Sequence, residues 1–249
     1  NHLTHCIMKK ILFILLTLTT IVSLSACRVE KVTTDYGNTT SWKADVNDFR
    51  GISLAGATTV YYQPSDTFSV VVKAPEKLRE RIGIEVDNGI LRLYDKKPSR
   101  GFFLANNSIP HYTVYVKAPY LSSIEIAGSS TFTCDKPFKA PDMEIDIAGQ
   151  GTVKLKELSV RTFKSSIAGQ GNLSATLTGV DNTDVDIAGQ GDINFVFHHC
   201  KKVSTSIAGM GNIHLSGDIE SLDKSISGMG DINTDQLTVG RSSEPTNRL

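Results

Sequence analysis

Apolar and polar residues alternate along much of the chain after residue 48. Val185 and Ile187 are separated by one polar residue, and Ile193, Phe195 and Phe197 continue the alternation after a break that contains glycine. A period of two residues is typical of β-strands that bury one face, and no stretch after residue 120 shows the 3.6-residue apolar stripe of a helix. The segments are also rich in Ile, Val, Thr and Ser, which favour strands. The pattern therefore predicts an all-β fold.

A short sequence word, Ile-Ala-Gly or, in the last copy, Ile-Ser-Gly, recurs at a nearly constant interval and is usually continued by x-Gly. Its first glycines are separated by 21, 20, 20, 20 and 19 residues, and they are Gly128, Gly149, Gly169, Gly189, Gly209 and Gly228. Such regular self-similarity is the signature of a solenoid. We predict a parallel β-helix with coils of about 20 residues that stack about 4.8 Å apart, preceded by a less regular β N-terminal part.

The glycine pairs are predicted to close the corners of the coils. Glycine adopts backbone angles that are strained for other residues, and it leaves room for the coils above and below. Short polar side chains follow the second glycine and are expected to bond their own backbone or to stack between coils; they are Asn172, Asp192, Asn212 and Asp231. A dinucleotide-binding loop is excluded, because no third glycine follows in register and no helix is apparent.

A calcium-binding nonapeptide roll is the nearest alternative for these words. Such rolls repeat every nine residues, whereas this chain repeats about every twenty. Thr152 and Asn172 also interrupt any continuous supply of carboxylates. An incidental calcium site among Asp186, Asp192 and Asp231 stays open as an alternative, but the sequence predicts no metal and no cofactor.

The region between residues 48 and 128 is strand-like but irregular. Asp87-Asn88-Gly89 lies between two alternating apolar runs, which predicts a hairpin. Ala55-Gly56-Ala57 is a degenerate copy of the repeat word, and Lys-Ala-Pro, which occurs three times, is expected to end strands because proline cannot donate to a ladder. Residues 96–110 form an irregular insertion, in which Phe102 and Phe103 are expected to pack over the end of the solenoid.

The start of the chain has the composition of a targeting segment. Met8-Lys9-Lys10 is followed by an apolar stretch from Ile11 to Leu24 and then by Ser25-Ala26-Cys27. This order resembles a bacterial lipoprotein signal peptide, whose final cysteine is acylated and becomes the new N-terminus. We expect Cys27 to carry the lipid. The predicted division is residues 1–7 as an upstream mis-start, 8–26 as the signal peptide, 27–47 as a polar tether, 48–234 as the β-solenoid domain and 235–249 as a C-terminal tail.

These features predict an exported protein that is held on a membrane without a spanning helix. The acyl chains each contribute burial of their methylenes in the lipid, and Arg28, rather than aspartate, follows Cys27, which favours the outer membrane. The chain of 249 residues carries 26 basic and 26 acidic residues, with no run of five like charges. Nucleic acid is therefore not an expected partner.

The repeated words and the preceding region resemble a known family. The run YVKAPYLSSIEIAGSS, the Ile-Ala-Gly-x-Gly words and the segment GIEVDNGILRLY are similar to the head GIN domain family of auto-transporter adhesins, over roughly residues 48–234. The resemblance implies a right-handed parallel β-helix and a location in the cell envelope. It brings no catalytic residues with it.

Clusters of reactive side chains are few. His198, His199 and Cys200 are adjacent, but neighbouring strand residues point to opposite faces, so a surface turn is favoured over a metal site. Cys134 and Cys200 lie more than three coils apart, about 15 Å along the axis, which is too far for a disulfide. We predict two free, buried thiols.

Two functions remain as hypotheses. A non-enzymatic envelope module would present a flat face to a protein or glycan, and its candidate binding residues are Gln150, Gln170, Gln190, Asn172, Asp192, Asn212 and Asp231. The alternative is a polysaccharide lyase or glycosidase. Asp146 and Asp186 occupy one register with Ser166 between them, about 10 Å apart, which is near the limit for an inverting pair of carboxylates. The sequence offers no third acid or basic clamp beside them, so the binding module is favoured.

Overall fold

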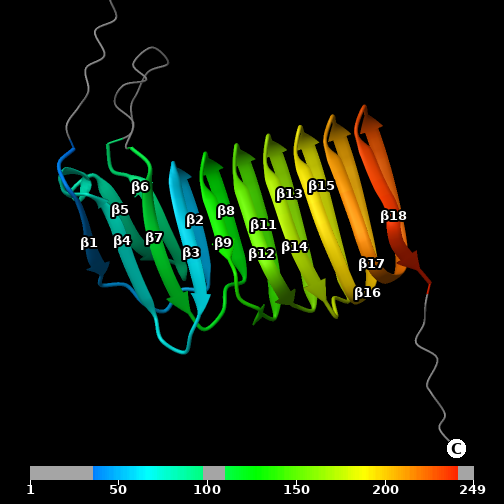
Figure 1. Ribbon diagram of the computed structural model, residues 1–249, viewed down its shortest axis with the longest axis horizontal. Helices are drawn as coiled ribbons and strands as arrows, with labels where there is room; N and C mark the ends of the chain where they lie inside the picture. The colour runs from blue at the N-terminus through cyan, green and yellow to red at the C-terminus, as the bar shows by residue number, and fades with distance from the viewer. Residues whose placement is uncertain (1–35, 98–109, 241–249) are drawn as a thin grey trace, which may run out of the picture. The chain divides into compact units, whose positions relative to one another are not determined.

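The structure is a computed structural model that describes residues 36–97 and 110–240 (Figure 1). Strands account for nearly all regular structure in these residues, and the single helical element among them is a 3-10 turn, Glu76–Leu78. No helix in this part of the chain is long and apolar enough to cross a membrane. The predicted all-β solenoid is confirmed.

Each regular coil contains two strands joined at a glycine corner. The strands before the corner are β11 (Asp142–Gly149), β13 (Thr162–Gly169) and β15 (Asn182–Gly189), and those after it are β12 (Thr152–Ser159) and β14 (Asn172–Thr178). The long strands β16 (Asp192–Gly209) and β17 (Asn212–Gly228) run through a corner and belong to both sides, and β18 (Asp231–Val239) ends the stack. Figure 1 shows these strands side by side in chain order.

The parallel register follows the repeat of the sequence. Ile147 pairs with Ile167, Ile167 with Ile187, and Ile187 with Ile207, so successive coils are offset by 20 residues. The first glycines align in the same way, since Gly149 is opposite Gly169 and Gly169 is opposite Gly189. The predicted column of glycines is therefore present.

Two outer faces result, and we call them face A and face B. Face A is formed by β5 (Ile82–Asp87), β6 (Ile90–Asp95), β2 (Gly51–Gly56), β8 (Ser123–Gly128), β11, β13, β15 and the second halves of β16 and β17. Face B is formed by β1 (Thr39–Ala44), β4 (Ser69–Pro75), β7 (Tyr112–Ala118), β3 (Thr58–Pro64), β9 (Thr131–Cys134), β10 (Phe138–Lys139), β12, β14, the first halves of β16 and β17, and β18.

The N-terminal part mixes antiparallel pairs into this scheme. β1 pairs with β4, β4 with β7 and β5 with β6 in antiparallel fashion. The predicted hairpin is β5–β6, and its two turn residues, Asn88 and Gly89, have φ of 51° and 76°, as a type I′ turn requires. Gly56 lies in register with Gly128, so the degenerate word at residues 55–57 starts the glycine column.

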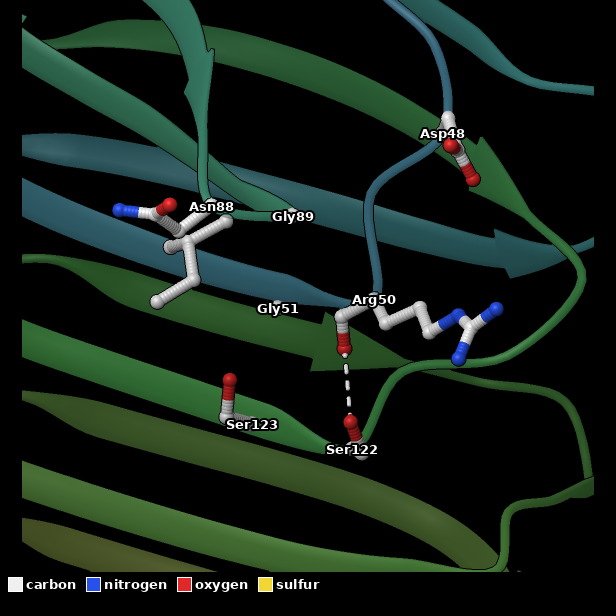
Figure 2. A pocket seen from close by; sticks show the side chains of 8 residues that line it. Asp48, Arg50, Gly51, Asn88, Gly89, Ser122 and Ser123 are labelled. Carbon is white, nitrogen blue, oxygen red and sulfur yellow. Dashed lines mark hydrogen bonds between the residues drawn. The ribbon is translucent and has the colours of Figure 1, made fainter.

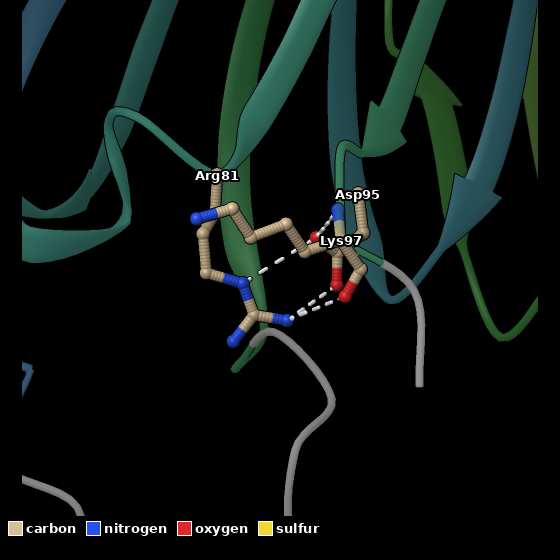
Figure 3. A network of polar contacts seen from close by, with 3 residues as sticks. All are labelled: Arg81, Asp95 and Lys97. Carbon is tan, nitrogen blue, oxygen red and sulfur yellow. Dashed lines mark hydrogen bonds and ion pairs between the residues drawn. The ribbon is translucent and has the colours of Figure 1, made fainter. Parts of the chain in front are cut away.

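An ion pair closes the open end of this hairpin (Figure 3). Ile82 and Asp95 are paired residues of β5 and β6, and the neighbouring Arg81 donates from Nη2 to Asp95 Oδ2 at 2.5 Å. The backbone N–H of Lys97 donates to Asp95 Oδ1 at 2.8 Å. Asp95 is mostly buried, with 16% of its side chain exposed. The pair thus fixes both strand ends at once.

The boundaries of the domain are wider than predicted. β1 lies inside the 27–47 segment that was predicted to be a polar tether, and β18 continues to Val239, inside the predicted 235–249 tail. Trp42 and Ala44 of β1 pack on the core, and Leu237 of β18 does so at the other end. β1 offers two apolar residues, and the part of β18 after residue 234 also offers two, which is too few for a period of two to be recognised.

The strand ends agree with the Lys-Ala-Pro prediction. β4 ends at Pro75, β7 ends one residue before Pro119, and β10 ends two residues before Pro141. Most of the predicted insertion at 96–110, including Phe102 and Phe103, lies outside the described residues, so its predicted packing stays a prediction.

The core lies between the two faces and consists of columns of inward side chains. Ile126, Ile147, Ile167, Ile187 and Ile207 form one column and are all buried. Aromatic rings fill the space beside this column. The rings of Phe163 and Phe195 pack edge to face, with their centroids 5.4 Å apart. The interior is therefore packed by side chains along the coils.

The last coil carries a charge where its predecessors carry core residues. Lys224 of β17 is opposite Thr205 of β16, and Thr205 is opposite Val185 of β15, so Lys224 continues an inward column. Lys224 is exposed at the edge of the stack. A charged side chain at an inward position opposes the addition of a further strand.

Candidate functional site

The three predicted glutamines form a ladder along the glycine corner. Gln150 Nε2 donates to Gln170 Oε1 at 3.0 Å, and Gln170 Nε2 donates to Gln190 Oε1 at 3.0 Å. Met210 and Met229 replace glutamine in the next coils and are 46% and 80% exposed. The side-chain amides are thus used largely by one another, and the ladder ties neighbouring coils together.

The four predicted Asn and Asp residues form a second column beside this ladder. Asn172, Asp192, Asn212 and Asp231 are aligned in register at the start of successive face-B strands, and all are exposed. Asn212 Nδ2 donates to Asp192 Oδ1 at 3.0 Å. The seven predicted residues therefore lie together as one exposed strip, and ligand binding by the strip stays a prediction. Cys27 lies outside the described residues.

The alternative calcium site is not assembled. Asp186 points out from face A, whereas Asp192 and Asp231 lie on face B with Asn212 between them. In residues 36–97 and 110–240, no group of three or more His, Cys, Asp and Glu side chains is arranged to hold a metal ion.

The His-His-Cys cluster is split by a bulge at a corner. His199 has φ of 53°, and its Nδ1 lies 3.0 Å from Asp218 Oδ2. His198 is exposed, whereas Cys200 is buried. Cys134 and Cys200 are both free and buried, as predicted. Burial raises the pKa of both thiols, which keeps them protonated and weakly reactive.

Face A gathers acidic side chains that the sequence analysis did not connect. Glu125, Asp146, Ser166 and Asp186 form one outward row, so the predicted register of the two aspartates is correct. A parallel row contains Glu144, Lys164 and Asp184. Both rows border a shallow cavity of about 290 Å³. A third acid and a base are therefore present beside Asp146 and Asp186, contrary to the expectation from sequence.

Asp146 lies in an unfavourable electrostatic environment. Partial burial, and then the charges of Glu144 and Glu125, raise the pKa of its carboxyl group above the ordinary value of 3.8. Like charges directly opposite each other destabilise a sheet. The folded protein therefore holds the Asp146 proton more tightly than the unfolded chain, and the resulting stability is present at low pH and is lost as pH rises through the raised pKa.

We expect Asp146→Asn to stabilise the protein at neutral pH, because the variant removes the repelled charge. The gain should be at most about 1 kcal/mol after solvent screening, and it should vanish at about pH 3, where the wild-type carboxyl is also neutral. Thermal unfolding at both pH values measures this difference. Asp231→Asn is the control, because Asp231 faces Asn212 in its column; an equal gain in both variants would contradict the explanation.

A second cavity, of about 440 Å³, lies at the N-terminal end of face A (Figure 2). Asn88 and Gly89 of the β5–β6 turn border it on one side, and Ser122 and Ser123, before and within β8, border it on the other. Ser122 Oγ donates to the backbone oxygen of Arg50 at 3.2 Å. The cavity is open and polar, and the charged residues Asp48 and Arg50 also line it.

A third cavity, of about 240 Å³, lies on face B and has an aromatic wall. Tyr61 of β3 and Tyr115 of β7 stack with ring centroids 5.6 Å apart and an interplanar angle of 18°. Both rings are exposed, at 43% and 46%. This pair was not predicted from the sequence. The available signal was that each tyrosine occupies an outward position of an alternating strand.

Fold and surface together define a class: a β-solenoid with a packed interior and flat, solvent-facing columns of polar side chains. The chain belongs to the family described as "Putative auto-transporter adhesin, head GIN domain", whose model matches residues 48–195 and again residues 176–243. The resemblance seen in the repeated words is therefore confirmed.

Solved structures with the same fold come from Bacteroides and Parabacteroides species. A "putative adhesin" from Bacteroides fragilis is 17% identical, with 79% of this chain and 96% of that chain covered and a TM-score of 0.62. A "putative adhesin" from Parabacteroides distasonis is 21% identical over 79% and 97% of the chains, with a TM-score of 0.59. A "putative lipid binding protein" from the same species is 26% identical over 79% and 96%, with a TM-score of 0.54. No functionally curated protein matches the sequence.

Proposed function

We propose that the chain is a non-enzymatic binding module of the cell envelope, anchored by a lipid on Cys27, which presents its outer faces to a glycan or a protein. The observation that carries this proposal is the set of exposed polar columns, repeated in register from coil to coil. A polymer that lies along the stack would meet the same groups about every 4.8 Å. The family and its adhesin-named relatives support a role in binding.

The packed interior favours binding at the outer faces. A protein that carries a lipid inside needs an apolar cavity. Here the space between the faces is filled by buried side chains, including Phe163, Phe195 and Phe197. The name of the lipid-binding relative describes that protein.

The anchor is tested by metabolic labelling with radioactive palmitate in a bacterial host. We expect label on the wild-type chain and none on Cys27→Ala. Labelled Cys27→Ala protein would contradict the anchor. The binding role is tested with a chain that starts at residue 28 and is made without the signal peptide. It is applied to arrays of glycans and extracellular proteins, where the proposal predicts saturable binding. Absence of binding on every array would overturn the binding role.

The acidic rows of face A favour a second candidate, polysaccharide processing. Asp146, with its raised pKa, would be the general acid, and Asp186, two coils away, would activate water. Incubation with polysaccharides and measurement of new reducing ends tests this function. Activity that Asp146→Asn and Asp186→Asn both remove would establish it in place of the binding role.

A further inference from the structure

The zero net charge of the chain hides an uneven distribution between the two faces. Outward positions of face A in the repeats carry the acidic rows described above. On face B, outward positions of β1, β3, β4, β7 and β9 include lysines but neither aspartate nor glutamate. Exposed lysines in and beside these strands include Lys43 in β1, Lys73 in β4, Lys117 in β7, Lys136 after β9, Lys139 in β10, and Lys154 and Lys156 in β12.

The stacked tyrosines lie in the middle of these lysines. Strand pairing places six residues in one continuous row across face B, with each residue opposite the next. In order, the row contains Lys43, Val71, Tyr115, Tyr61, Thr133 and Lys154. Lys117 and Lys136 border the same cavity as the two rings, together with Gln63, Thr133 and Asp135. We call this region, Tyr61, Tyr115, Lys117, Lys136 and their neighbours, the tyrosine–lysine surface.

A purely structural role explains only part of this arrangement. A cross-strand aromatic pair stabilises a sheet wherever it occurs. It does not require that the rings stay exposed, nor that amide, hydroxyl and ammonium groups surround them. Those are the features of a site in which an aromatic platform takes an apolar ligand face and polar groups fix its orientation.

We propose that the tyrosine–lysine surface binds an acidic polysaccharide. The apolar C–H faces of pyranose rings would lie on Tyr61 and Tyr115, ring carboxylates would meet Lys117 and Lys136, and sugar hydroxyls would bond with Gln63, Thr133 and Asp135. This inference rests on the proposed binding role and names its site and ligand class. It also assigns the contact to face B, away from the acidic rows that would repel such a polymer.

The composition of the surface favours a glycan over a lipid membrane. Interfacial binding requires a cluster of deeply inserting Leu, Phe or Trp side chains. Here the exposed aromatic residues are two tyrosines with polar tips, and the aliphatic residue in their row, Val71, is half-buried. Thr and Gln side chains around the rings suit hydroxylated ligands instead.

The test compares two polymers with the same sugar backbone, polygalacturonate, whose carboxyl groups are charged, and its fully methyl-esterified form, whose carboxyl groups are neutral. Each is titrated calorimetrically into the full chain. We expect polygalacturonate to bind at least about tenfold more tightly and to lose affinity with added salt. The Tyr61→Ser/Tyr115→Ser variant should bind about tenfold more weakly. The Lys117→Gln/Lys136→Gln variant should lose the preference for the charged polymer. Circular dichroism confirms that each variant is folded.

The matched control removes the same two charges from face A. Lys164→Gln/Lys202→Gln should bind polygalacturonate as tightly as wild type or more tightly. The inference is overturned if this control weakens binding as much as Lys117→Gln/Lys136→Gln does, or if the esterified polymer binds as tightly as polygalacturonate. It is also overturned if the protein binds phosphatidylglycerol vesicles but not alginate, hyaluronate or polygalacturonate. Array ligands whose binding the face-B variants leave unchanged would overturn the inference and leave the binding role standing. Absence of every ligand would overturn both.

Discussion

Ile187→Asp is expected to abolish the folded state. Ile187 is 2% exposed and is stacked between Ile167 and Ile207 in the isoleucine column. The substitution removes a buried side chain and places an unpaired carboxylate between two apolar neighbours. Such burial costs several kcal/mol, in addition to about 2–5 kcal/mol for the lost packing, which together approach the whole stability of a typical domain.

The adjacent residue supplies the control for this prediction. Ala188 is exposed on face A, opposite Ala168 and Ala208. Ala188→Asp adds the same charge one residue away, and we expect it to remain folded with a small change in melting temperature. Circular dichroism and thermal unfolding compare the two variants. A cooperative transition for Ile187→Asp at the wild-type temperature would show that the column is not the core.

Gly189→Ala should be the second strongly destabilising change. Gly189 has φ of 151°, and a Cβ built on it would lie close to the backbone oxygen of Gly169 in the preceding coil. The alanine would therefore add backbone strain and would also push two coils apart. We expect a loss of roughly 3 kcal/mol or more, measured by denaturant unfolding.

Gly56 separates the two causes. It starts the same column with φ of 130°, but a Cβ there would meet nothing within 4 Å. Gly56→Ala should therefore show the strain alone, roughly 1–2 kcal/mol, and remain clearly more stable than Gly189→Ala. Equal losses in the two variants would mean that contact between coils is not what requires glycine in the column.

The repeated part of the fold could be predicted because one local rule is applied many times. A nearly constant offset of 20 residues fixes the partners in the central coils, so the Ile, Gly and Gln columns there follow from the sequence once strands are assumed. The same offset placed Asp146 and Asp186 correctly. The register that aligns the glycines also brings Glu125, Glu144 and Asp184 together on face A. The prediction from sequence did not include these three acids.

The tyrosine–lysine surface could not be predicted from the period. Tyr61 and Tyr115 are brought together by the parallel pairing of β3 with β7, while β4 joins the same face in the antiparallel direction. These pairings follow no constant offset, and alternation alone does not reveal which of the two faces a strand joins. The lysines therefore appear scattered in the sequence, with a net charge of zero for the chain.

Recognition of the ligand by the outer surface of face B is tested most directly by chemical-shift mapping. A uronic-acid oligosaccharide titrated into the isotopically labelled protein should shift the backbone signals of Tyr61, Tyr115, Lys117 and Lys136, with face A unchanged. Shifts confined to face A, around Asp146 and Asp186, would contradict the account.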